Sequence, residues 1–158
     1  MEPTFGYLVS DVARLLRKIF DQRARQVGLS LAQCRALVYL AHYEGINQAC
    51  LADLLEVQPI SLTRLLDRME AADWIERRAD PADRRAHRLY LSEKARPLLE
   101  LVQQLSLQAR LEALAGFSEE EKTVLMGFLS RVHGNLCSRA PACHPVSEPV
   151  DDKQELAR

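Results

Sequence analysis

Apolar residues recur every three or four positions over most of the chain, and this spacing predicts helices. The first helix should cover about residues 5–27, because Leu8, Val12, Leu15 and Ile19 share one face before Gly28. Later helices should begin after residues that cap helix N-termini, which are Ser30, Asn47, Ser92 and Ser118. Ser118 and Glu121 also have the spacing of a capping box.

The stretch from Gln58 to Ser92 departs from this helical pattern. Pro59 suits the first position of a helix, whose buried face should consist of Leu62, Leu65, Leu66 and Met69. Two strands should follow, joined by a turn rich in Asp, Pro and Arg. A preceding short helix, capped by Asn47, completes a helix-turn-helix unit. We therefore expect a recognition helix followed by a wing.

The whole chain is predicted to be mainly α, a winged helix-turn-helix with about six helices and a two- or three-stranded wing. With 158 residues it should form one domain. The first and last helices carry more leucine than such a unit can cover, and burying each leucine is worth about 1.5–3 kcal/mol. We therefore expect helices from both chain ends to form the dimerisation region of a homodimer.

The charge of the chain is local rather than global. The formal net charge is −1, which argues against a nonspecific nucleic-acid coat protein but not against specific DNA binding. Five arginines lie between Arg77 and Arg88. Arg64 and Arg68 share one face of the predicted recognition helix, with Ser61 one turn earlier, and such a face suits a DNA major groove.

Several other classes of protein are disfavoured by the sequence. No apolar run approaches the length of a membrane span, and we see no signal peptide, so a cytoplasmic location is expected. The four cysteines should then be reduced thiols. We find no nucleophile elbow, P-loop, Rossmann glycine pattern or clear metal cluster, so neither an enzyme nor a cofactor is expected.

The segment ACLADLLEVQPISLTRLLDRMEAADWIERRADPADRRAHRLYLS resembles the helix-turn-helix and wing of MarR-type regulators. Its most specific part is the wing pattern D-P-x-D-R-R-x-x-x-L-x-L-[ST], and the start S-D-V-A-R-L-L-R is similar to the SlyA branch. The resemblance covers about residues 5–137. It implies a MarR-like domain over 1–138, with dimerisation helices at 5–44 and 92–138 and a DNA-binding lobe at 45–91. The remainder, 139–158, is expected to be a disordered tail.

The resemblance implies a homodimeric transcription regulator that binds a palindromic operator in double-stranded DNA. Such regulators are usually repressors that a small aromatic or phenolic ligand releases. Carried over by position, Arg85 is the wing-tip residue that enters the minor groove, beside Arg84, and Asp83 holds it in place. The recognition-helix positions that meet bases and phosphates are Ser61, Thr63, Arg64 and Arg68.

The same resemblance places the ligand between the dimer helices and the DNA-binding lobe. Arg14 would pair with a ligand carboxylate, although a salt bridge within the protein is an equal alternative. Cys34 and Val38 occupy the positions where the branch has a ligand-lining Trp and His, a departure that argues against salicylate-like binding but leaves a more apolar ligand open.

Two alternative functions remain open from the sequence. Cys34 and Cys50 could make the protein a thiol-based redox-responsive regulator, and the wing could be a protein-interaction module. A metal site is not predicted, because the spacing of four candidate ligands matches no strong zinc pattern; they are His133, Cys137, Cys143 and His144.

Overall fold

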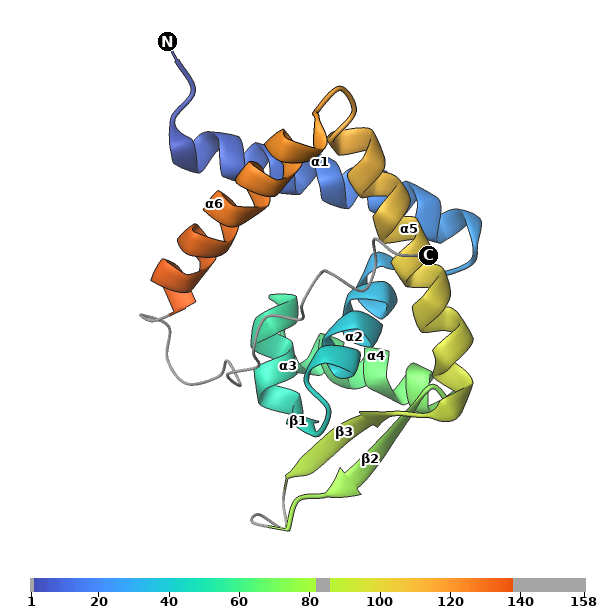
Figure 1. Ribbon diagram of the computed structural model, residues 1–158. Coiled ribbons are helices and arrows are strands. Elements are labelled where there is room, and N and C mark those ends of the chain that lie inside the picture. Colours follow the sequence, from blue (N-terminus) through green and yellow to red (C-terminus); the bar gives the residue numbers. More distant parts are fainter. Residues whose placement is uncertain (1, 82–85, 138–158) are drawn as a thin grey trace.

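The computed structural model describes residues 2–81 and 86–137, and Figure 1 shows their arrangement. The elements follow in the order α1 (Phe5–Gln26), α2 (Leu31–His42), β1 (Ile46–Asn47), α3 (Gln48–Leu55), α4 (Pro59–Ala71), β2 (Ile75–Ala79), β3 (His87–Leu91), a 3₁₀ turn (Glu93–Ala95), α5 (Arg96–Ala113) and α6 (Glu119–Cys137). The described part is thus mainly helical with a small sheet, as the sequence predicts. The predicted tail, 139–158, lies outside the described residues.

The sheet has three antiparallel strands in the order β1-β3-β2. β3 pairs with β2 over the full length of the wing, with Ile75 opposite Leu91, and its other edge pairs with β1, where Ile46 lies opposite Leu89. Ile46, Ile75 and Leu89 all turn their side chains into the core. The sequence predicts a wing of two or three strands, and the structure has three. β1 attaches the wing to the start of α3.

The core is built around α2, which packs against α1, α3, α4, α5 and β3. Its residues Cys34, Leu37 and Leu40 are at most 1% exposed. The predicted apolar face of α4 is confirmed, since Leu62, Leu65, Leu66 and Met69 are all buried. Burial of this face fixes which side of α4 points outward.

The helix ends confirm most of the predicted caps. The Asn47 side chain accepts from the backbone N–H of Cys50 at 2.8 Å, and Ser118 and Glu121 form the expected capping box. Ser92 is a correction: its side chain caps no helix. The Ser92 hydroxyl instead donates to the backbone carbonyl of Asp73 at the base of the wing. A short 3₁₀ turn separates it from α5.

Gly45 lies where the α2–β1 connection passes close to β3. Its φ of 78° is in the left-handed region, and a Cβ there would lie 3.0 Å from the Tyr90 hydroxyl oxygen. The Arg78 guanidinium lies over the Tyr90 ring, 4.1 Å from the ring centroid. Because glycine has no Cβ, residue 45 leaves room for the Tyr90 side chain, whose ring contacts Arg78.

The helices from the two chain ends are the least covered part of the molecule. In Figure 1, α6, α1 and the C-terminal end of α5 lie at one end, and α3, α4 and the sheet lie at the other. No described residue of α6 is buried, and α1 exposes Leu8, Val12 and Leu15. Among the described residues no helix is long and apolar enough to cross a membrane.

Candidate nucleic-acid interface

The outward face of α4 is defined by its position opposite the buried stripe. At 3.6 residues per turn, the side opposite Leu62, Leu66 and Met69 is exposed. Besides Ala71 at the last position of the helix, it carries four exposed residues: Ile60, Arg64, Asp67 and Arg68. We call these four residues the outer face of α4. It combines two guanidinium groups, one carboxylate and one apolar side chain.

The side chains of Arg64 and Arg68 make no ion pair or hydrogen bond with the part of the chain that the structure describes. Both side chains are exposed and four residues apart, so they point the same way from consecutive turns. A guanidinium without a carboxylate partner keeps its full charge and all its donors for an external acceptor. These two arginines are the cations of the outer face.

The acidic residues of α4 are paired with a cation from the wing. Arg77 on β2 donates from Nη2 to Asp67 Oδ1 at 2.8 Å and from Nη1 to Glu70 Oε2 at 2.5 Å. The Arg77 side chain is only 19% exposed. This arginine therefore binds both acids beside Arg64 and Arg68 and offsets part of their negative charge.

Thr63 and Ser61 differ in how free their hydroxyls are. Ser61 is exposed. The Thr63 hydroxyl donates to the Pro59 carbonyl at 3.0 Å and accepts from Gln48 Nε2 at 2.7 Å. Thr63 thus connects α4 to α3, a structural role that the sequence did not reveal.

The turn between α3 and α4 is held from α2. Arg35 donates to the backbone carbonyls of Leu54 and Leu55, at 2.9 and 3.0 Å. These carbonyls at the C-terminus of α3 have no partner within the helix. Glu56 then adopts φ 56°, and the chain reverses into Pro59. Arg35 therefore fixes the angle between the two helices of the helix-turn-helix unit.

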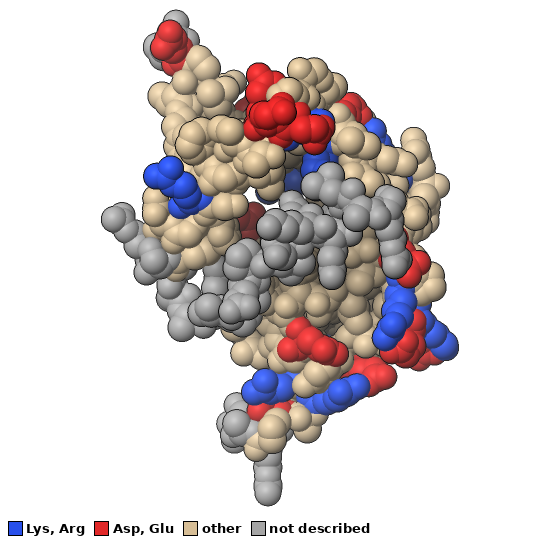
Figure 2. Space-filling model, in the orientation of Figure 1, with Lys and Arg blue, Asp and Glu red and all other residues tan. Residues whose placement is uncertain are grey.

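Arginines on the wing are paired with nearby acids. Arg78 and Arg88 lie directly opposite each other on β2 and β3, an arrangement of like charges that would be unfavourable alone. Arg78 bonds Glu76, and Arg88 Nε lies 3.0 Å from Asp80 Oδ2. Figure 2 shows basic and acidic side chains side by side at the sheet end of this face.

The predicted wing-tip residues Asp83, Arg84 and Arg85 lie outside the described residues. Arg88, which the sequence pattern grouped with the turn, belongs to β3.

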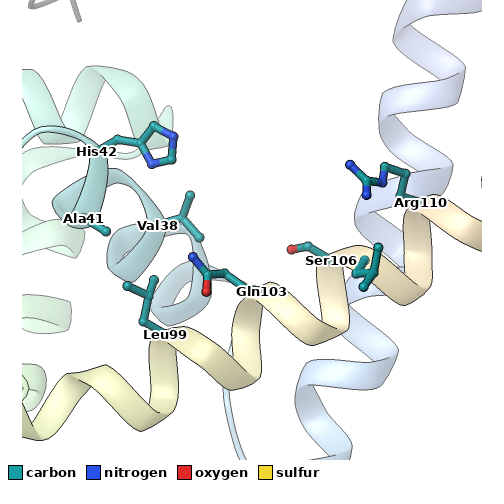
Figure 3. Close-up of a pocket in the computed structure, with 8 residues that line it drawn as sticks. Val38, Ala41, His42, Leu99, Gln103, Ser106 and Arg110 are labelled. Carbon is teal, nitrogen blue, oxygen red and sulfur yellow. The ribbon is translucent and has the colours of Figure 1, made fainter. Parts of the chain in front are cut away.

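A cavity of about 220 Å³ lies between α2 and α5. Figure 3 shows its lining, with Arg110 at the end beside α1 and His42 at the opposite end. Its lining residues are Val38, Ala41, His42, Leu99, Gln103, Ser106, Leu107 and Arg110. The Arg110 side chain makes no ion pair or hydrogen bond within the described ranges. The cavity therefore combines apolar walls with a cation that is available to an anion.

Of the three predicted ligand residues, the structure places only Val38 in this cavity. Cys34 is fully buried in the core. Arg14 is exposed and pairs with Asp11, with its Nη2 2.6 Å from Asp11 Oδ1. Arg110 was missed, although its position four residues after Ser106 on the polar side of α5 could have drawn attention to it.

The described cysteines are free thiols in different surroundings. The pKa of the Cys34 thiol is raised to about 11, mainly by burial and to a smaller degree by the nearby Asp21 charge. Cys50 is half-buried. Cys137 Sγ lies 3.4 Å from His133 Nε2, but among the described residues no group of three potential ligands could hold a metal ion.

Comparison with known proteins identifies the fold and the family model that matches its central part. The family model described as "MarR family" matches residues 29–87. The solved transcriptional regulator PA3341 is 32% identical, with a TM-score of 0.71 over 85% of this chain and 99% of that one. Wild-type MarR from E. coli in its apo form has a TM-score of 0.75 at 24% identity, over 84% of this chain and 98% of its own. The transcriptional regulator SlyA is 26% identical, with a TM-score of 0.67 over 83% of this chain and 92% of its own.

The burial of Cys34 predicts its reactivity. In the folded protein at pH 7.5, iodoacetamide should modify Cys137 and leave Cys34 unmodified, because a buried thiol with a raised pKa provides almost no thiolate. Peptide mass spectrometry after timed quenching measures both sites. In denaturant the two cysteines should react at similar rates, which is the control.

The same raised pKa predicts a pH dependence of stability. The folded state holds the Cys34 proton more tightly than the unfolded state does. The contribution of Cys34 to the free energy of unfolding is therefore complete below pH 9 and is lost as the pH rises toward 11.

In the labelling experiment, equal modification of Cys34 and Cys137 in the folded protein would contradict the burial of Cys34.

Proposed function

Because the chain belongs to the MarR family of transcription regulators, we propose that it is a sequence-specific DNA-binding repressor that acts as a homodimer. Its family makes it a transcription regulator rather than an enzyme. One observation carries the proposal: within the described residues, Arg64 and Arg68 on the outer face of α4 have no side-chain partner, while Arg77 pairs with both neighbouring acids, Asp67 and Glu70. The identity of 26% with SlyA supports a place in the SlyA branch.

In the proposed complex, α4 enters the major groove of double-stranded DNA. Arg64 and Arg68 bind guanine edges or phosphates, since a guanidinium can reach guanine O6 and N7 together. Ser61 and Thr63 flank this contact. From the family resemblance, Arg85 enters the minor groove with Arg84 beside it and Asp83 holding it, because a narrow minor groove concentrates negative potential.

We expect the protein to select a defined DNA sequence from a library of genomic fragments, and Arg64→Ala and Arg68→Ala to weaken its binding. Loss of a base contact should cost about 1–3 kcal/mol, which is about 5- to 150-fold in affinity. Loss of a phosphate contact should reduce the slope of log K against log salt concentration by about one. Fluorescence anisotropy at several salt concentrations measures both quantities.

The matched control is Arg96→Ala. Arg96 is also exposed on a helix, but it pairs with Glu93 and lies at the start of α5, away from the outer face. It should bind the selected DNA as the wild type does. A library without any enriched sequence would instead favour a protein-interaction module, and equal affinity of all three variants would exclude α4 as the reading helix.

The proposed homodimer would use the exposed apolar residues of the end helices. Leu111 on α5 and Phe128 on α6 are each 58% exposed, and α1 contributes Phe5, Leu8 and Val12. So many exposed apolar side chains on helices that lie at one end of the molecule are unfavourable in water. A second copy that packs its own α1, α5 and α6 here would cover them. The two lobes would then match a palindromic operator.

We expect wild-type protein to sediment with twice the chain mass of 17.9 kDa, and Phe128→Glu to shift it toward monomer, because the interface would have to desolvate a carboxylate. Sedimentation equilibrium across a concentration series measures the change. Ile60→Glu is the control, since Ile60 is exposed to a similar degree but lies on α4. A monomeric wild type, or equal behaviour of the two variants, would contradict the proposed interface.

We further propose that a small aromatic or phenolic acid binds in the cavity between α2 and α5. Val38, Leu99 and Leu107 would contact its ring, and Arg110 would pair with its anionic group. Both cavity walls belong to helices that pack against the DNA-binding lobe or the dimer ends, so an occupant there would alter the spacing of the two lobes. This position supports release of DNA by the ligand.

Benzoate and 2-hydroxybenzoate are suitable probes. Both should bind the wild type in isothermal titration calorimetry, and Arg110→Gln should weaken binding severalfold, because the charge-assisted hydrogen bond to the anionic group is lost. Arg14→Gln is the matched control, because Arg14 pairs with Asp11 on α1. Equal loss in the two variants, or no binding at millimolar probe, would contradict this assignment of the cavity.

A DNA-bound regulator works where the DNA lies, so we include a cytoplasmic location in the proposal.

A further inference from the structure

Ile60 is an exposed isoleucine at the first turn of α4, with 64% of its surface open to solvent. The other large apolar side chains that are exposed in the described residues belong to α1 and its C-cap, to α5, to α6 or to the loop between α5 and α6. The proposed dimer covers those regions. It leaves Ile60 uncovered, because α4 lies at the opposite end of the molecule (Figure 1).

The position of Ile60 on the helix places it among the proposed DNA contacts. At about 100° per residue, it lies opposite the buried stripe and one turn before Arg64. Ser61 is its exposed neighbour, and Pro59 starts the helix. The N-terminal residues of a recognition helix are those that contact base edges, so Ile60 would be as deep in the groove as Arg64.

The major groove contains one strongly apolar group, the C5-methyl of thymine, among its hydrogen-bonding edges. Isoleucine has no polar atom on its side chain and could not replace the water of any other base edge. The Arg64 guanidinium beside it would fix the helix on a neighbouring base or phosphate, and Asp67 is bound by Arg77. The outer face therefore has an apolar contact next to a cationic one.

We propose that Ile60 reads a thymine methyl group in each half-site of the operator, within a few bases of the contact made by Arg64. This inference rests on the proposed DNA-binding function and adds a specificity-determining residue to it. Removal of a buried methyl group corresponds to about a threefold to fivefold loss of affinity.

The test uses the full chain and the DNA sequence that it selects from a library. Each thymine of that sequence is replaced singly by deoxyuridine, which differs from it only by the missing methyl group. One position in each half-site should lose about threefold to fivefold in affinity for the wild type. The same substitution should have no effect on Ile60→Ala. Arg96→Ala, the control outside α4, should retain the full loss.

The outcomes separate this inference from the function on which it rests. If the protein enriches no sequence, the proposed function fails and the inference fails with it. If it enriches a sequence but no deoxyuridine substitution weakens binding, or the loss is equal in Ile60→Ala, DNA binding stands and the role of Ile60 is overturned. Because Ile60 is exposed, its replacement by alanine leaves the core of the lobe intact.

Discussion

The structure depends on the burial of one helix, α2, on nearly all of its sides. Leu37 and Leu40 are inaccessible to solvent because α1, α3, α4, α5 and β3 all pack around them. Burying each of these leucines is worth about 1.5–3 kcal/mol. The same helix holds the turn before α4 through Arg35 and lines the cavity toward α5. Any change in the packing of α2 against α5 therefore acts on an element that also positions the proposed reading helix.

Electrostatics divides the arginines of the lobe into two groups. Arg77, Arg78 and Arg88 have carboxylate partners. The ion pairs of Arg77 join the wing to α4, that of Arg78 lies within β2, and that of Arg88 joins β3 to the residue after β2. Arg64 and Arg68 lie on the outer face without such partners in the described chain. A net charge near zero is compatible with a basic DNA-facing surface. The chain contains about as many acids as bases, but intramolecular ion pairs offset the acids near that surface.

Local patterns were sufficient to predict the helices, the wing and the buried face of α4, because spacing and capping depend on residues three or four positions apart. Contacts between distant segments could not be predicted this way. The bond from Ser92 to Asp73, the pairing of β1 with β3 and the two acids bound by Arg77 depend on packing. Ile60 was missed for a different reason: one apolar residue outside a periodic stripe has no pattern. Only the direction of α4, fixed by Leu62 and Leu66, reveals that it points outward.

The ion pairs of Arg77 mean that the basic character of α4 does not belong to α4 alone. Within the helix, Arg64 and Arg68 are balanced by Asp67 and Glu70, so the isolated segment is electrically neutral. The strand that follows supplies the compensating guanidinium. A recognition helix grafted into another scaffold would take its carboxylates along and leave their counter-charge behind. In the proposed mode of DNA binding, α4 therefore needs β2 beside it, because β2 carries the arginine that binds the acids of α4.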